Sequence, residues 1–349
     1  MERRAPAVED VVMAREFWAG RSVFVTGAAG LVGSWLCHSL LDEGARVAGL
    51  VRDEDGESPL LRSSDSQRMT LVHGDLTDLR TLERAAVEYE VETLFHLGAQ
   101  PIVGTADELP LETFESNVRG TYNVLEACRR HPSLVRRIVV ASSDKAYGAQ
   151  ARLPYTEDMS LDGRRPYEVS KVCADLLAQS YRISYALPVA IARCGNIYGG
   201  GDLNWSRLIP DTIRAILLRR RPVIRSDGKF VRDYVYVKDV VAAFMRLAEK
   251  LDDATVRGEA FNFSPERPYT VLEVVSVIQD LMHGNDLEPI IEGGAKSEIH
   301  SQYLDSSKAR KVLGWSPRYT FEEGLQETIA WYREFMEAHP QEAAAGSGR

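Results

Sequence analysis

The sequence feature that most constrains this chain is a set of spaced glycines between an apolar segment and a helix-like one. The apolar run 22–26 ends at Gly27, and Gly30 and Gly33 follow at three-residue intervals before an apolar-periodic stretch over 36–41. This order predicts a strand, a tight turn and a helix. Gly27 lets the chain turn sharply, Gly30 lets the backbone approach a pyrophosphate, and Gly33 lets the helix pack closely on the strand.

This turn is a candidate site for a dinucleotide. A pyrophosphate would sit on the N–H groups at the positive end of the helix, so Gly27, Gly30, Leu31 and Val32 are cofactor-binding candidates. The spacing G-x-x-G-x-x-G differs from the commonest fingerprint, G-x-G-x-x-G, and a purely structural turn is the alternative. The place of the glycines after a strand and before a helix favours nucleotide binding.

The type of dinucleotide depends on the residues that follow the second predicted strand, 46–51. An acid there binds the ribose 2′-hydroxyl of NAD, whereas an arginine accommodates the 2′-phosphate of NADP. This sequence has both, as Arg52 and Asp53. We expect NAD because of Asp53, with NADP as the alternative that Arg52 supports.

Strands and helices alternate through the first 200 residues. We expect strands at 22–26, 46–51, 69–73, 93–97, 137–141 and 189–193, helices at 79–87, 113–130 and 165–185, and a loop at 53–67. The alternation predicts an α/β fold, a doubly wound parallel (Rossmann) sheet with helices on both faces. Asp75, Leu76 and Gly98 follow predicted strands and therefore lie at the edge where such sheets bind ligands, which makes them further cofactor-binding candidates.

The pattern weakens after residue 200. Helices are expected at 208–220, 272–283 and 321–339, and short strands at 223–225, 260–263 and 289–292. Short elements and many turn residues suit a smaller α+β lobe that binds the substrate. The expected domains are a leader at 1–20 with a short helix near 11–18, a dinucleotide-binding domain at 21–200, a substrate-binding lobe at 201–339 from which some strands return to the sheet, and a flexible tail at 340–349.

Composition excludes several classes of partner. The 349 residues carry a net charge of −9 and no long basic run, so nucleic acid is not an expected partner. No apolar run approaches the roughly 20 residues that span a bilayer, and residues 1–10 do not form a signal peptide. The four cysteines are scattered, which favours buried thiols in a reducing compartment and gives no metal-ligand spacing. We therefore expect a cytoplasmic protein without a metal site.

A cluster of catalytic candidates follows the strand at 137–141. Tyr167 and Lys171 lie four residues apart on a predicted helix, and the cation would stabilise a phenolate that takes a proton from a substrate alcohol beside Ser143. An exposed i, i+4 pair is the alternative. Asp144 and Lys145 could act as acid and base, but adjacent residues of a strand point to opposite faces. Both can face a substrate only if the strand has ended before them; a surface ion pair is the alternative.

At this point the chain resembles the extended short-chain dehydrogenases/reductases, in particular their nucleotide-sugar epimerase/dehydratase branch. The resemblance covers about 22–335. Its motifs are the glycine turn, His73 to Leu76, Asn117 to Ala127, Tyr167-x-x-x-Lys171, Arg193 to Gly199 and Arg232 to Asp239.

The resemblance implies roles for individual residues. Ser143, Tyr167 and Lys171 match the catalytic triad of the family, whose tyrosine and lysine also contact the cofactor. Asp75 matches a residue that contacts adenine. Asn196 and Arg232 match residues that contact the phosphates of the nucleotide sugar, and Arg207 is a further substrate-binding candidate. The helices at 113–130 and 165–185 match a pair that forms a four-helix bundle, which implies a homodimer.

Ser143-Asp144-Lys145 distinguishes between the reactions of this branch. Many 4,6-dehydratases have Thr-Asp-Glu here, and Ser-Asp-Lys is similar to the CDP-glucose 4,6-dehydratases, as are the stretches 165–171 and 200–207. GDP-mannose 4,6-dehydratases are a more distant likeness. We therefore expect conversion of a nucleotide hexose, CDP-glucose favoured, to its 4-keto-6-deoxy form. The alternatives are 4-epimerisation or decarboxylation on the same scaffold, and a non-catalytic nucleotide-binding regulator.

Overall fold

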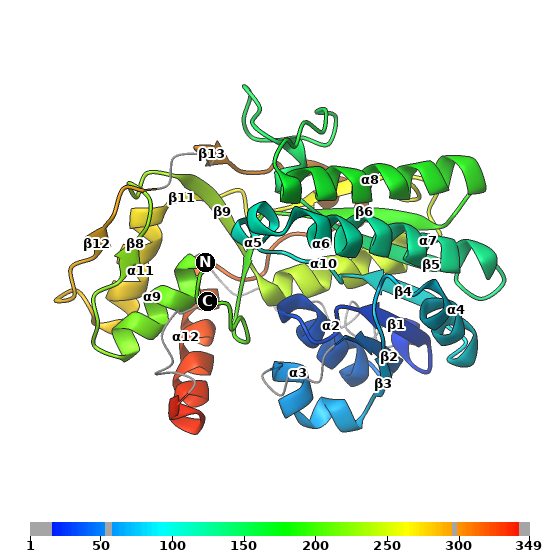
Figure 1. Cartoon of the computed structure of the whole chain (residues 1–349), viewed down its shortest axis with the longest axis horizontal. Helices are drawn as coiled ribbons and strands as arrows, with labels where there is room; N and C mark the ends of the chain where they lie inside the picture. Colours follow the sequence, from blue (N-terminus) through cyan, green and yellow to red (C-terminus); the bar gives the residue numbers. More distant parts are fainter. Residues whose placement is uncertain (1–15, 53–57, 295–298, 342–349) are drawn as a thin grey trace. The chain divides into compact units, whose positions relative to one another are not determined.

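The computed structural model describes residues 16–52, 58–294 and 299–341, which fall into two compact units (Figure 1). The first unit contains the chain up to residue 146 together with 163–192 and 241–260. The second contains 147–162, 193–240 and the chain from 261 onward. Neither unit is continuous in sequence.

Most of a seven-stranded sheet lies in the first unit. Its strands are β1 (Ser22–Thr26), β2 (Arg46–Val51), β3 (Thr70–His73), β4 (Thr93–His96), β5 (Arg137–Ser143), β6 (Val189–Cys194) and β10 (Ala260–Phe263). They lie in the order β10-β6-β5-β4-β1-β2-β3, and the neighbours from β5 to β3 pair in parallel. The chain therefore winds outward in both directions from β1, which confirms the predicted doubly wound Rossmann sheet.

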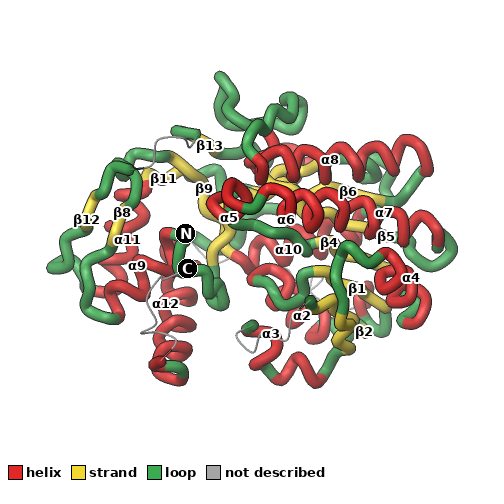
Figure 2. Tube along the Cα trace, viewed as in Figure 1, coloured by secondary structure: helices red, strands yellow, loops and turns green. Residues whose placement is uncertain are grey.

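Helices flank both faces of this sheet (Figure 2). The long ones are α2 (Leu31–Asp42), α4 (Leu79–Glu88), α7 (Gly120–Arg130), α8 (Pro166–Tyr185) and α10 (Val237–Lys250). Helix α2 packs on β1 and β2, whereas α4, α7 and α8 pack side by side. The apolar core between sheet and helices includes Phe24, Leu94, Val124 and Ile138, all buried.

The predicted loop at 53–67 is wrong for its described part. A short helix, α3 (Pro59–Arg62), and a 3₁₀ turn (Ser64–Gln67) form there instead. Leu60 is buried, and the Ser63 hydroxyl accepts a hydrogen bond from the Asp65 N–H at 3.2 Å. One buried leucine and a serine cap stabilise elements too short to show periodicity.

The predicted helix at 113–130 is confirmed in extent, but it contains a π-helical turn that the sequence does not predict. The chain forms α5 (Val103–Glu108) and α6 (Pro110–Phe114), then a wide π-helical turn (Glu115–Arg119) that leads into α7. The buried residues here include Thr113, Asn117 and Gly120, so a pattern of apolar residues does not reveal the turn. Turns of this kind are frequently found at functional sites.

The second unit has the short elements of an α+β lobe. Strand β9 (Val231–Tyr236) pairs in parallel with β7 (Asn196–Tyr198) and β13 (Ser301–Gln302) and antiparallel with β11 (Pro268–Thr270). Strands β8 (Val223–Ile224) and β12 (Ile290–Ile291) pair separately. Helices α9 (Leu208–Leu217), α11 (Val271–Met282) and α12 (Phe321–Ala338) pack against one another, and a second π turn lies at Ala309–Leu313.

The sequence prediction contains neither β9 nor α10. Strand β9 buries Arg232 and Asp233 among its aromatic residues, so its pattern is neither alternating nor continuously apolar. Among the described residues, no helix is both long enough and apolar enough to cross a membrane.

Candidate active site

The glycine turn between β1 and α2 has the shape that the sequence predicts. Gly27 adopts a φ of +70°, and a Cβ there would lie 2.7 Å from the Gly98 nitrogen. A Cβ on Gly33 would lie 2.0 Å from the Gly27 carbonyl oxygen, so only glycine permits this helix–turn contact. Gly30 is exposed, and its Cβ would meet only the Gly27 oxygen at 3.3 Å. The backbone at Gly30 is therefore open to a ligand.

Helix α2 begins at this turn with half-exposed Leu31 and Val32. Its N-cap, Gly30, supplies no side-chain hydrogen bond. The N–H groups of the first turn of a helix have no intrahelical acceptor and carry the positive end of the helix dipole. These are the groups at which the sequence predicts a pyrophosphate.

Two further cofactor-binding candidates meet the same turn. A Cβ on Gly98, after β4, would lie 2.9 Å from Leu76 Cδ1 and 3.3 Å from the Gly27 nitrogen. Asp75, after β3, accepts hydrogen bonds at Oδ1 from the N–H and the hydroxyl of Thr77 at 2.8 and 2.7 Å. Gly27, Leu76 and Gly98 are thus gathered at the carboxyl edge of the sheet, with Asp75 next to Leu76.

The residues predicted to select NAD or NADP are only half described. Arg52 follows β2 and is exposed, whereas Asp53 lies outside the described residues. The choice of NAD over NADP from these two residues stays a prediction.

Strand β5, which carries Ser143, ends before Asp144 and Lys145. Strand β5 stops at Ser143, and a 3₁₀ turn (Asp144–Tyr147) begins at the next residue. The alternation of side chains along a strand therefore does not apply to Asp144 and Lys145, so both can face a substrate. Ser143 Oγ donates to Asp144 Oδ1 at 2.9 Å and accepts from the Lys145 N–H at 3.2 Å.

Asp144 is buried with half of its carboxylate unused. The residue is 2% exposed, and its Oδ2 has no hydrogen-bond partner among the described residues. A buried carboxylate oxygen without a partner is costly and rare in native structures. Such an atom indicates a position for a ligand group.

Tyr167 and Lys171 lie one turn apart at the start of α8. Both are buried, and Lys171 Nζ is 5.9 Å from the centre of the Tyr167 ring. Lys171 Nζ donates to the Ala141 carbonyl at 3.1 Å, which ties the helix to β5 two residues before Ser143. Glu168 Oε2 accepts from the Arg165 N–H at 3.2 Å and so fixes the first turn of α8. The structure thus brings the predicted triad to one end of β5.

The side chains that support this triad are not among the residues predicted from the sequence. Asn117, in the π turn, donates from Nδ2 to Ser170 Oγ at 2.9 Å and accepts at Oδ1 from the Gln100 N–H at 2.7 Å. His96 ends β4 and is hydrogen-bonded to Thr121 at 2.9 Å. The motif 117–127 contains Asn117 and Thr121, but only the topology shows that β4 delivers His96 to them.

The predicted substrate-binding residues all lie in the second unit. Arg232 is buried, and its guanidinium donates to the carbonyls of Val231 and His300 at 2.8 and 3.1 Å. Asn196 lies on β7, which pairs with β9, and donates to the Asp233 carbonyl at 3.3 Å. Arg207 is the N-cap of α9 and pairs with Asp202 at 2.7 Å.

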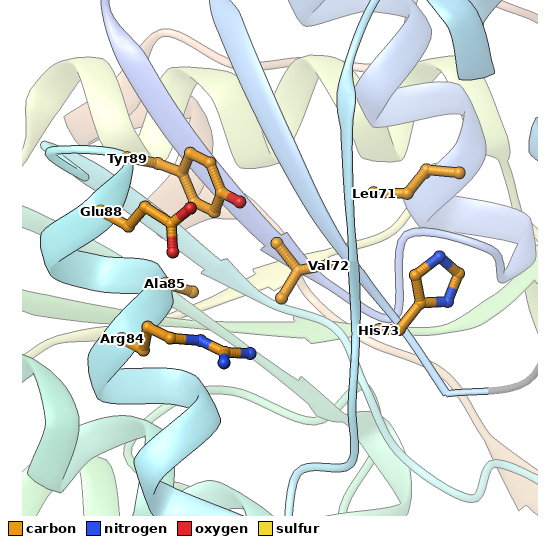
Figure 3. Close-up of a pocket in the computed structure, with 7 residues that line it drawn as sticks. All are labelled: Leu71, Val72, His73, Arg84, Ala85, Glu88 and Tyr89. Atoms are coloured by element: carbon orange, nitrogen blue, oxygen red, sulfur yellow. The ribbon is translucent and has the colours of Figure 1, made fainter.

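The structure also contains a cavity of about 340 Å³ apart from these residues (Figure 3). It lies between the edge strand β3 and helix α4, and none of the predicted site residues lines it. Its lining residues are Leu71, Val72, His73, Arg84, Ala85, Glu88 and Tyr89. The cavity is therefore not part of the candidate active site.

Comparison with known proteins connects this geometry to a family. The family described as GDP-mannose 4,6 dehydratase matches residues 24–328. A CDP-glucose 4,6-dehydratase from Salmonella typhimurium is 32% identical over 337 residues, 92% of this chain and 93% of that protein. A UDP-glucose 4-epimerase from Mycolicibacterium smegmatis is 32% identical over 316 residues, 88% of this chain and 97% of that protein.

A solved structure agrees in fold. A dTDP-glucose 4,6-dehydratase from Streptomyces venezuelae, with NAD and TYD bound, has a TM-score of 0.82 and 27% identity. The match covers 91% of this chain and 99% of that one.

Proposed function

Because the chain belongs to the GDP-mannose 4,6 dehydratase family, we propose that it is a nucleotide-sugar 4,6-dehydratase with CDP-glucose as its substrate. Family membership confirms the resemblance stated from the sequence. The observation that carries the reaction type is the buried Asp144 carboxylate, whose Oδ1 accepts from Ser143 Oγ and whose Oδ2 has no partner among the described residues. A simple 4-epimerase has no step that requires a second acid there.

The first unit fits NAD as the cofactor. The turn from Gly27 to Val32 offers backbone N–H groups to the pyrophosphate, and added Cβ atoms at Gly27 and Gly33 would collide with backbone. Structural relatives are solved with NAD. When bound, NAD would supply the acceptor for a hydride from sugar C4 and the donor that returns it to C6.

Tyr167, Lys171 and Ser143 serve the oxidation at C4. Tyr167 takes the proton of the 4-hydroxyl, and the Lys171 cation stabilises the phenolate that does so. Ser143 holds the 4-oxygen through a hydrogen bond. Because Tyr167 and Lys171 are both buried and one helical turn apart, their geometry is fixed before substrate binds.

Asp144 and Lys145 serve the loss of water. The 4-ketone acidifies the C5 hydrogen, and neutral Lys145 takes it as a proton. The C6–O bond breaks as protonated Asp144 donates to the departing hydroxyl, so that water leaves and a C5–C6 double bond remains. A hydride at C6 and a proton at C5 then give the 4-keto-6-deoxy sugar.

The second unit supplies the residues proposed to bind the nucleotide part of the substrate. Arg232 and Asn196, on paired strands, and Arg207, at the N-terminus of α9, present groups that suit phosphates. The similarity of 200–207 to CDP-glucose enzymes and the Salmonella relative support the choice of CDP-glucose.

A panel of sugar nucleotides tests this proposal. Purified protein is incubated with CDP-glucose, dTDP-glucose, UDP-glucose and GDP-mannose, and each product is weighed by mass spectrometry. We expect the loss of one water, fastest from CDP-glucose, and no loss with Tyr167→Phe. An unchanged mass with a new sugar epimer would identify the 4-epimerase that the mycobacterial relative suggests. If the protein converted none of the four sugar nucleotides, that result would support a non-catalytic nucleotide-binding protein.

A further inference from the structure

His96 lies at the centre of a hydrogen-bonded chain in the interior of the first unit. The residue is 3% exposed. Its Nδ1 is 2.8 Å from Thr26 Oγ1 at the end of β1, and its Nε2 is 2.9 Å from Thr121 Oγ1 on α7. Burial and the nearby Lys171 charge lower the pKa of His96 to about 3, so the imidazole is neutral at pH 7.

The partners of the two hydroxyls determine which imidazole nitrogen carries the proton. Thr121 Oγ1 donates its one hydrogen to the Asn117 carbonyl at 2.6 Å, so it accepts from the His96 Nε2–H. His96 Nδ1 is then the acceptor and takes the hydrogen of Thr26 Oγ1. Thr26 Oγ1 in turn accepts from the Gly98 N–H at 3.1 Å. Each donor therefore has an acceptor, and the chain runs in one direction from Gly98 to Asn117.

This chain connects the cofactor-binding turn to the catalytic helix. At one end, Gly98 packs against Gly27, whose added Cβ would be 2.7 Å from the Gly98 nitrogen. At the other end, Asn117 Nδ2 donates to Ser170 Oγ at 2.9 Å, and Ser170 Oγ donates to the Tyr167 carbonyl at 2.7 Å. The π turn at Asn117 is the bend through which the chain reaches α8.

We propose that His96 is a positioning residue: acting through Thr121, it fixes the π turn at Asn117 and so sets the spacing between the Gly27–Gly98 turn and the Tyr167–Lys171 pair. The inference rests on the proposed function only in that Tyr167 and Lys171 act in hydride transfer from C4, which a dehydratase and a 4-epimerase share. Errors of about 1 Å in such spacings cost about 100-fold in rate.

Thr121→Val removes the link without changing the shape of the side chain, and the protein contains a matched control. Thr328 on α12 is equally buried and likewise donates to the carbonyl four residues earlier, that of Gly324, at 2.6 Å. Thr328 belongs to the second unit and has no part in the His96 chain. Thr121→Val and Thr328→Val both lose a hydroxyl-to-carbonyl hydrogen bond, and only Thr121→Val also loses the bond from the His96 Nε2–H.

We expect Thr121→Val to slow single-turnover reduction of bound NAD by sugar nucleotide about 10- to 100-fold, with a less than twofold change in KM. Thr121→Ser should restore the rate to within about threefold. Thr328→Val should also lower the unfolding midpoint, though less than Thr121→Val, which leaves the His96 N–H without an acceptor, and it should keep the wild-type rate. Equal rates in the two valine variants would overturn the proposal.

A second readout does not depend on turnover. Because the proposed NAD site includes both the glycine turn and the helix that carries Tyr167, Thr121→Val should raise the NAD dissociation constant about 10-fold in calorimetry, whereas Thr328→Val should not. His96→Asn keeps an acceptor for Thr26 but does not reach Thr121, so it should match Thr121→Val, and the double variant should be no worse than either. Additive losses, or unchanged NAD affinity in Thr121→Val, would contradict the proposal. Normal NAD affinities without sugar turnover in the wild type would instead defeat the proposed function.

Discussion

Replacement of Asp144 by asparagine should make the protein more stable and less active at once. Asn Oδ1 can still accept from Ser143 Oγ, at the 2.9 Å of the carboxylate bond, and the neutral Nδ2 takes the place of the unpartnered Oδ2. A buried, unpaired polar atom costs about 1–3 kcal/mol, and more when charged. Asparagine leaves an unpaired polar atom at this place but removes the charge, so we expect the free energy of unfolding to rise by only about 1 kcal/mol. Removal of the acid should slow water loss by about 10²- to 10⁴-fold.

The assay is denaturant unfolding of both proteins, followed by water loss measured by mass spectrometry. Asp175 supplies the control, because it is fully buried on α8 and its Oδ1 accepts from Gln179 Nε2 at 2.7 Å. Asp175→Asn should not stabilise the protein. If Asp144→Asn were destabilised like a partnered buried carboxylate, the view of Asp144 as a group kept for catalysis would be refuted.

Four further outcomes are expected. Asp144→Asn with Lys145→Met should bind sugar nucleotide, reduce its cofactor and stall, seen as near-ultraviolet absorbance in a single turnover; normal product release would assign the acid/base work elsewhere. Tyr167→Phe should keep the fold by circular dichroism and lose turnover about 10²- to 10⁴-fold, and wild-type turnover would defeat the triad. Burial raises the pKa of Asp239 from 3.8 to about 6, so its contribution to stability is full below pH 3.8 and is lost as pH rises through 6. In denaturant unfolding, the free energy of unfolding of Asp239→Asn should therefore gain about 3 kcal/mol relative to that of the wild type between pH 4 and 7.5. Parallel pH profiles of the two proteins would contradict this. Light scattering at micromolar concentration should show a dimer formed through α7 and α8. Ile183 on α8 is 83% exposed, and Ile183→Glu should dissociate this dimer. A monomeric wild-type protein would refute the dimer.

Local signals allowed much of the first unit to be predicted. The strands Ser22–Thr26 and Arg46–Val51 have the predicted bounds because each is a short apolar run closed by a turn or a charge. The glycine turn could be predicted because each glycine meets a steric requirement of its own. Ser143, Tyr167 and Lys171 lie on two contiguous motifs that the topology brings to one end of β5.

The features that sequence did not reveal depend on contacts distant in the chain. The π turn buries Asn117, a polar residue, and the hydrogen bonds of Asn117 to Gln100 and Ser170 exist only in the folded state. His96 has no motif of its own and gains its partners from β1 and α7. Strand β9 buries charged residues, which a pattern of apolar residues cannot predict.

The central claim is that this chain moves a hydride within one sugar while removing water. The measurement that tests it most directly uses CDP-glucose with deuterium at C4, and follows the product by mass spectrometry and NMR. The account predicts a product lighter by one water that carries the deuterium at C6. Deuterium retained at C4, in a sugar of unchanged mass, would contradict it.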